Sequence, residues 1–348
     1  MSYNRFATPR VYTDLINFNL ANGYMTLAGD TTIIQDDGST AVTFDSGSKE
    51  SMFDMRPSNY AKIEKENKGF YIQIDTNMGN DKLPESNFLA ILNHNFATAD
   101  AIFKVESDDD VNFGSTTVLS NSSEYSDVIN AEQTEANQIN PTGDGWTLMT
   151  WNTAESNNRY LRITIEDDDS AGNNFIEDVV IGSIMWGEYF DFPHSPDLEI
   201  STSIDFDGVN LQRSVSGSTY SNASNLGVPG WHSTQPFQVS STAAQETYTF
   251  NQRFGRIQHS MNFSYLTDTD VFSEDWHESD YDKWFDDLNI HNSFINKVYG
   301  QHLPFLFSID KDSTSPGDYG LYRMTNQPSF KQVANRVWNT SLNIIEEY

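Results

Sequence analysis

Two stretches decide the fold of this chain, and the first reads Asn87-Phe-Leu-Ala-Ile-Leu-Asn-His94-Asn-Phe, continuing as Ile102-Phe-Lys-Val-Glu-Ser-Asp108. The second reads Arg159-Tyr-Leu-Arg-Ile-Thr-Ile-Glu166 and continues as Val179-Val-Ile-Gly-Ser-Ile-Met-Trp-Gly-Glu188. All four segments are rich in aliphatic and aromatic residues, which suit the half-buried surface of a pleated sheet. We therefore expect each of them to form a strand.

Alternation of side chains predicts further strands on either side of these stretches. Successive side chains of a strand point to opposite faces, so one buried face produces a period of two. That period occurs at Phe70, Ile72 and Ile74, at Leu161, Ile163 and Ile165, at Ile257, His259, Met261, Phe263 and Tyr265, and at Trp338, Thr340, Leu342 and Ile344. The chain is therefore expected to be mainly β.

Helical patterns are fewer. The main predicted helix covers about residues 274–299, where apolar residues recur near i, i+3 and i+4 and Gly300 stands where a C-cap glycine would. The run from Pro9 to Gly23 fits either a short helix ended by Gly23 or a bent strand, because its periodicity does not decide between them. The segment Phe192-Pro-His-Ser-Pro-Asp197 reads as an extended linker, so we expect units at 1–59, 60–193 and 198–348.

Composition excludes several classes of protein. The net charge of −30 provides no basic footprint for nucleic acid and disfavours an anionic membrane surface. The chain has no cysteine, so disulfides and thiolate metal sites are excluded. No run approaches the roughly 20 apolar residues of a membrane helix, and the first residues lack an apolar signal core. We therefore expect synthesis in a cytoplasm without export by a standard signal.

A family resemblance adds to this interpretation. Residues 59–193 are similar to discoidin or galactose-binding-like domains inserted in tail and baseplate proteins of tailed bacteriophages. The segments that carry the likeness are Leu89-Ala-Ile-Leu-Asn-His-Asn, Arg159-Tyr-Leu-Arg-Ile-Thr-Ile and Ile181-Gly-Ser-Ile-Met-Trp-Gly. Four further segments also resemble sequences of phage virion proteins. They are Thr8-Pro-Arg-Val-Tyr, Asp207-Gly-Val, Leu303-Pro-Phe-Leu-Phe-Ser-Ile-Asp310 and the terminal Trp338-Asn-Thr-Ser-Leu-Asn-Ile-Ile-Glu-Glu-Tyr.

The resemblance implies a jelly-roll sandwich at 60–193 and a second, β-rich assembly domain built from 1–59 and 198–348. It implies a distal-tail-like ring component of the virion, assembled in the host cytoplasm. Its partners would be copies of itself, other tail or baseplate proteins and, through the sandwich, a host surface glycan. Two alternatives stay open: a glycan-binding adhesion, fibre or capsid decoration protein, and a polysaccharide-active enzyme with a binding module. The expected function is not enzymatic, and no residue is assigned a catalytic role.

One acidic run resembles a calcium loop. An EF-hand-type loop has oxygen ligands at positions 1, 3, 5 and 12 and glycine at position 6. Asp167, Asp169, Gly172 and Asp178 fit this pattern, but Ala171 occupies the fifth position. A solvated acidic hairpin loop is the competing interpretation, so no cofactor is expected apart from Ca²⁺ as a candidate at Asp167, Asp169 and Asp178.

Tryptophans are the candidate sugar-binding residues, because an exposed indole can stack on a sugar. Trp231, in the turn Gly227-Val-Pro-Gly-Trp-His232, and Trp151 are the candidates, although sandwich cores also bury tryptophan. His94 lies within a predicted strand, where we expect it to satisfy a hydrogen bond and not to bind a metal.

Overall fold

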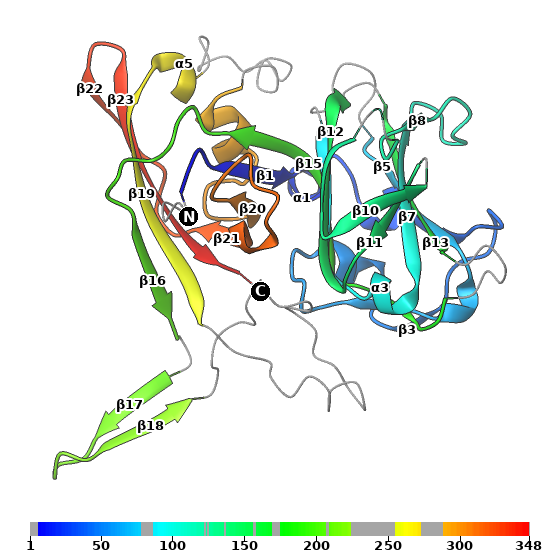
Figure 1. Ribbon diagram of the computed structural model, residues 1–348, viewed down its shortest axis with the longest axis horizontal. Coiled ribbons are helices and arrows are strands. Elements are labelled where there is room, and N and C mark those ends of the chain that lie inside the picture. Colours follow the sequence, from blue (N-terminus) through cyan, green and yellow to red (C-terminus); the bar gives the residue numbers. More distant parts are fainter. Residues whose placement is uncertain are drawn as a thin grey trace.

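The computed structural model describes residues 6–77, 86–121, 123, 125–135, 137–155, 158–168, 175–206, 209–223, 255–272 and 288–347. The prediction of a mainly β chain is confirmed, since strand residues far outnumber helical ones among the described residues and the strands pair in antiparallel sheets (Figure 1). None of the described helices is long and apolar enough to cross a membrane.

The largest sheet, here called sheet A, runs through both halves of the molecule. Its strands, in spatial order, are β16 (Ser201–Asp205), β19 (Arg256–Leu266), β23 (Val337–Glu346), β21 (Tyr319–Met324), β20 (Phe305–Ser308), β1 (Arg10–Asp14), β15 (Ser183–Asp191), β6 (Ser86–His94), β12 (Gly145–Glu155) and β9 (Tyr125–Ile129), with β22 (Phe330–Ala334) paired to β23.

Three smaller sheets complete the strands. Sheet B contains β10 (Ala131–Glu135), β11 (Gln138–Pro141), β7 (Ala101–Asp108), β13 (Tyr160–Asp167), β5 (Phe70–Asp75) and β2 (Thr31–Gln35), with β8 (Thr117–Val118) on β7. A third sheet holds β14 (Val179–Ile181), β4 (Ala61–Ile63) and β3 (Phe44–Ser46). A separate hairpin consists of β17 (Val209–Arg213) and β18 (Thr219–Ala223).

Short helices connect these strands. The α-helices are α1 (Leu15–Asn22), α2 (Leu27–Asp30), α3 (Phe96–Ala99) and α5 (Asp268–Val271). The 3₁₀ turns are η1 (Lys49–Phe53), η2 (Lys65–Asn67) and η4 (Pro316–Asp318), and η3 (Ile290–Asn296) is π-helical. Of the predicted helix at 274–299, residues 274–287 lie outside the described residues. The rest contains η3, and Gly300 follows with φ +63°.

The predicted sandwich is confirmed. One end of sheet A packs against sheet B, and the two sheets share a hydrophobic core. Leu89 and Ile91 of β6 reach this core together with Ile163 of β13. The alternate β6 residues Phe88 and Leu92 belong to a second core on the other face of the strand. Burial on both faces explains why β6 reads as a continuous apolar run.

Strand β1 joins the sandwich to the C-terminal half. It pairs with β15 on one side and β20 on the other, so that Tyr12 lies opposite both Tyr189 and Leu306. A Cβ at Gly187 of β15 would stand 1.9 Å from the carbonyl oxygen of Thr13. The close approach of β1 to β15 therefore requires glycine at position 187.

The N-terminal segment is divided between the two halves. We expected residues 1–59 to belong with the C-terminal third, but β2 pairs with β5 and β3 pairs with β4, both within the sandwich. The apolar residues Ile33 and Met52 are buried in the sandwich core. This part of the domain assignment is corrected, because the core that buries a segment decides where the segment belongs.

His94 makes the hydrogen bonds expected of a structural histidine. Its Nε2 lies 2.9 Å from Thr147 Oγ1, and its Nδ1 accepts from the Phe96 amide at 3.3 Å. An accepting Nδ1 carries no proton, so the ring is the neutral Nε2–H tautomer. Burial lowers the pKa of His94 from its ordinary 6.5 to about 3.

We predict that His94 makes the stability of the chain fall as the pH is lowered. Between about pH 3 and 6.5 the unfolded chain binds a proton at His94 that the folded chain does not. The contribution of neutral His94 to the free energy of unfolding is therefore complete above pH 6.5, the pKa of the residue in the unfolded chain. Below that pH the contribution decreases by up to about 1.4 kcal/mol per pH unit. Urea unfolding at pH 7 and pH 5 should show a smaller loss for His94→Gln than for the parent. A ring whose NMR shifts titrate near pH 6.5 in the folded chain would contradict the assignment.

Candidate functional site

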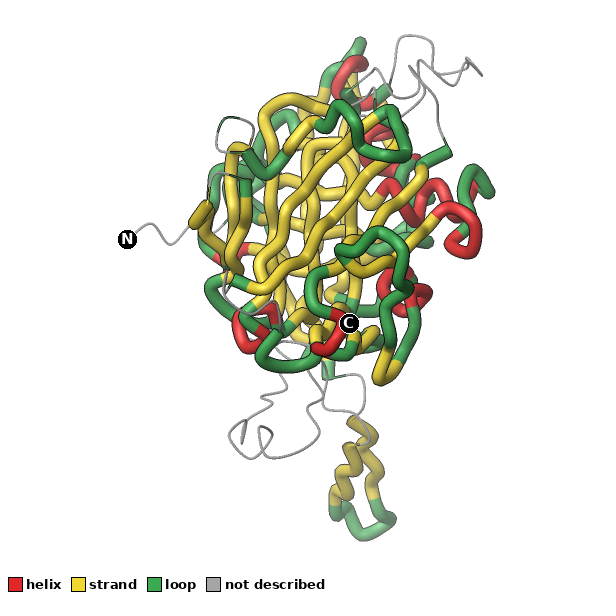
Figure 2. Tube along the Cα trace, turned by 90° about the vertical axis from the view of Figure 1, so that its right-hand side faces the viewer, coloured by secondary structure: helices red, strands yellow, loops and turns green. Residues whose placement is uncertain are grey.

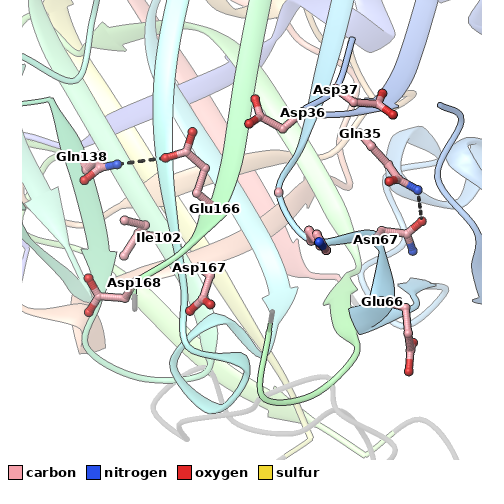
Figure 3. A pocket seen from close by; sticks show the side chains of 12 residues that line it. Gln35, Asp36, Asp37, Glu66, Asn67, Ile102, Gln138, Glu166, Asp167 and Asp168 are labelled. Carbon is pink, nitrogen blue, oxygen red and sulfur yellow. Dashed lines mark hydrogen bonds between the residues drawn. The ribbon is translucent and has the colours of Figure 1, made fainter. Parts of the chain in front are cut away.

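The sandwich carries an open depression of about 870 Å³ at one end of sheet B. Antiparallel pairing creates it, because Gln35 of β2 and Ile165 of β13 both lie opposite Phe70, while Glu166 lies opposite Ile102. The residues that line it are Gln35, Asp36, Asp37, Glu66, Asn67, Lys68, Gly69, Ile102, Gln138, Glu166, Asp167 and Asp168 (Figure 3).

Hydrogen bonds fix part of this lining. Asn67 accepts from Gln35 Nε2 at 3.0 Å and from the Thr43 amide at 2.8 Å, and its own amide donates to the Glu64 carbonyl at 2.5 Å. Gln138 Nε2 donates to Glu166 Oε2 at 3.0 Å. The loop before β5 is thereby tied to β2, and β11 is tied to β13. The depression therefore presents fixed side-chain oxygens.

The depression is strongly acidic, with six carboxylates and one lysine in its lining. Asp37 is stabilised as an anion, since hydrogen bonds from the hydroxyl and amide of Thr40 and the amide of Ser39 lower its pKa to about 2. Carboxylate and amide oxygens accept hydrogen bonds from hydroxyl or ammonium groups. Among the described residues, however, no three acidic or histidine side chains are grouped so that they could hold a metal ion.

The two calcium candidates that the structure describes, Asp167 and Asp178, have different surroundings. Asp167 lines the depression, but Asp178 does not. Asp178 instead forms an ion pair with Lys62 Nζ at 2.8 Å and accepts from the Lys65 amide at 3.0 Å. Asp169 lies outside the described residues. The alternative interpretation, an acidic loop without calcium, fits Asp178 better, because Lys62 already neutralises its charge.

The sugar-binding prediction for Trp151 is wrong. Its side chain is 1% exposed, its Nε1 donates to the Ser86 carbonyl at 2.8 Å, and its ring meets Trp186 edge to face. Trp151 therefore contributes to the core between the sheets and offers no surface for a sugar. The other candidate, Trp231, lies outside the described residues.

Sequence analysis missed most of the depression. Only Asp167 was among the candidates, whereas Asp36, Asp37, Asn67 and Glu166 were not. The available signal was the acidic turn Asp36-Asp-Gly38 after a short β-branched run. Its proximity to the acidic end of β13 depends on the pairing of β2 with β5, and local patterns do not reveal that pairing.

A second candidate site is an arm at the opposite end of the molecule. The β17–β18 hairpin projects away from the body in both views (Figures 1 and 2), and among the described strands β17 and β18 pair only with each other. Every residue of β16 and β17 is exposed. Within residues 198–220 the exposed large apolar side chains are Leu198, Ile204, Phe206, Val209, Leu211, Val215 and Tyr220.

The hairpin has two different faces. Val209, Leu211 and Arg213 share one face, while Asn210 and Gln212 occupy the other. The segment 209–223 contains no carboxylate, although the whole chain has 50. One face of the hairpin therefore exposes Val209 and Leu211 beside the cation of Arg213, and the segment carries no negative side chain.

No protein-family model matches this chain, and no curated protein matches it. Among solved structures, the chain is similar to a doubly substituted CpGH89 from Clostridium perfringens in complex with its substrate GlcNAc-alpha-1,4-galactose, at 15% identity and a TM-score of 0.22. That match covers 47% of this chain and only 14% of the other. A truncated AlyQ with CBM32 and alginate lyase domains matches at 12% identity and a TM-score of 0.25, covering 88% of this chain and 97% of the other. At such scores neither likeness carries an argument about function.

Proposed function

We propose that this chain is a structural subunit that assembles with copies of itself through the β17–β18 hairpin. The observation that carries the proposal is the exposure of that hairpin. A lone two-stranded hairpin is marginally stable in water at best. An exposed face with Val209 and Leu211 gains stability when a second surface covers it.

Charge favours the same interface. Copies of a chain with a net charge of −30 repel one another over most of their surface. The hairpin lacks carboxylates and carries Arg213, so a neighbouring copy can approach it with less repulsion. A contact between the hairpin and a different patch of the next copy is heterologous, and such contacts close into rings when the rotation allows it.

The particle that we propose is the tail tip or baseplate of a tailed bacteriophage, where the chain would be a distal-tail-like ring component. The assignment to a phage tail rests on the sequence resemblance described above. The other tail and baseplate proteins would be its further partners, and the sandwich would be a peripheral module. An acidic ring lumen would repel passing DNA.

Loss of the hairpin is predicted to abolish assembly. The full chain should form a closed oligomer by light scattering, and a variant with residues 209–223 replaced by a Gly-Ser linker should stay monomeric. Leu211→Gln should weaken association by about tenfold or more, since burying a leucine contributes about 1.5–3 kcal/mol.

The matched control is Gln212→Ala on the opposite hairpin face, which should associate as the parent does. A full chain that is monomeric at every concentration would contradict the proposal. Assembly that persists without the hairpin would contradict this choice of interface.

A host-glycan-binding adhesion is the second candidate, and the depression on the sandwich is the observation that favours it. Carboxylate oxygens in its lining, such as those of Glu166, can accept hydrogen bonds from sugar hydroxyls. A glycan array probed with the full chain and with Glu166→Gln separates the two functions. Binding that the variant loses would favour adhesion, and an array without binding would leave assembly as the better proposal.

A further inference from the structure

A small buried cavity lies where α1 packs on the sandwich. Its lining is mostly apolar and comes from five separate parts of the chain: Leu15, Ile16, Asn19, Met25, Thr76, Ser86, Leu161 and Trp186. The helix is held here by Asp14, whose carboxylate accepts from the amides of Ile16 and Trp186, both at 3.2 Å. The cavity therefore occupies the joint between the N-terminal segment and β15.

Two polar atoms in this lining lack a hydrogen bond. Asn19 Oδ1 and Trp186 Nε1 are both buried, and neither has a partner anywhere in the described structure. Their residues are 2% and 0% exposed. One atom is an acceptor and the other is a donor, and leaving either unpaired in a dry interior destabilises the fold.

A third group in the lining can also accept. Thr76 is 3% exposed, and its hydroxyl donates to the Arg159 carbonyl at 2.7 Å. Because its proton is committed to that bond, the oxygen of Thr76 keeps lone pairs with which it can accept a hydrogen bond. The residues that line the cavity thus include one unpaired donor, Trp186 Nε1, one unpaired acceptor, Asn19 Oδ1, and the hydroxyl oxygen of Thr76.

The size of the cavity decides what can fill it. Its volume is about 10 Å³, which is close to the minimum for one water molecule. A sugar or a hydrated cation is far larger, and none of the described lining residues has a charged side chain for a bare ion. We propose that this cavity is a binding site for a single structural water, which accepts from Trp186 Nε1–H and donates to Asn19 Oδ1 and Thr76 Oγ1.

Three hydrogen bonds are the usual number for a buried water. This water links α1 to the side chain of Trp186, next to the link that Asp14 makes to the Trp186 main chain. The water also connects α1 and Trp186 to Thr76, which directly follows β5 of sheet B. The water is therefore a bridge that holds the N-terminal helix against both sheets.

The test uses the full chain labelled with ¹⁵N-tryptophan. The indole N–H of Trp186, assigned with Trp186→Phe, should show a cross-peak to water whose sign indicates a long-lived bound molecule. Asn19→Leu fills the cavity and removes one acceptor, so the cross-peak should disappear and the indole proton should move upfield. If Asn19→Leu does not fold, Thr76→Val provides the same comparison with a smaller change of shape.

A crystal structure of the parent chain gives an independent readout. Density for one water should lie about 3 Å from each of the three polar atoms. A parent chain without the water cross-peak would overturn the proposal. A direct Asn19–Trp186 hydrogen bond with no density between the two side chains would overturn it as well.

Discussion

Gly187→Ala is expected to lower the free energy of unfolding by about 3 kcal/mol, the upper end of the usual cost of overpacking. The added methyl group would stand 1.9 Å from the carbonyl oxygen of Thr13 and 3.0 Å from the amide nitrogen of Leu15. Both are main-chain atoms, so the contact cannot be relieved by rotating a side chain. Strand β1 would have to move away from β15, and its pairing with β20 would be strained at the same time. The midpoint of urea unfolding measures the loss.

Gly143→Ala is the matched control for this substitution. A Cβ at Gly143 would meet no atom within 4 Å. This variant should therefore stay within about 0.5 kcal/mol of the parent or gain slightly in stability. Equal unfolding midpoints for the two alanine variants would show that β1 does not approach β15 as closely as described.

Lys297→Met is expected to cost about 3–5 kcal/mol, because it leaves a buried carboxylate without its cation. Lys297 of the segment after η3 forms an ion pair with Glu188 of β15, and their side chains are 2% and 3% exposed. This contact joins the C-terminal half to the sandwich. Its loss should lower the midpoint of urea unfolding strongly.

Two comparisons distinguish this loss from a general effect of removing lysine. Lys311→Met breaks an exposed pair with Asp312, whose side chains are 34% and 74% exposed, and should cost no more than about 1 kcal/mol. The double variant Glu188→Leu/Lys297→Met removes both charges and should recover much of the single variant's loss. Equal losses for Lys297→Met and Lys311→Met would show that the Glu188 pair is not isolated from water.

Strands with a single buried face were predictable from the sequence. The alternation at Leu161, Ile163 and Ile165 appears as β13, and that at Phe70, Ile72 and Ile74 appears as β5, with these residues in the sandwich core. Alternation reports only that one face is buried, so it identifies a strand without identifying its neighbours.

The pairing of distant strands was not predictable in the same way. The run from Pro9 to Gly23 contains both of the alternatives left open, since β1 is followed by α1, which is capped by Asp14 at its start and by Gly23 at its end. Asp14 also accepts from Trp186, which lies 172 residues away. A pattern read within one segment contains no information about such a partner.

The residues of the candidate sites could not be predicted for a related reason. Trp151 lies in a strand that reads equally well with either face inward, and only the position of the opposite sheet decides that its ring is buried. Conversely, the depression forms where strand ends and loops of sheet B meet, and none of its residues stands out in the sequence when taken alone. The acidic composition was visible in the sequence, but its concentration at one end of sheet B was not.

The central position of β1 has a consequence for biosynthesis. Strand β1 is synthesised nearly 300 residues before β20, one of the two strands that it pairs with. At ordinary translation rates this interval is on the order of tens of seconds. Throughout it the nascent polypeptide presents an open strand edge that could join a wrong partner, so overproduction should be sensitive to chaperone supply and growth temperature.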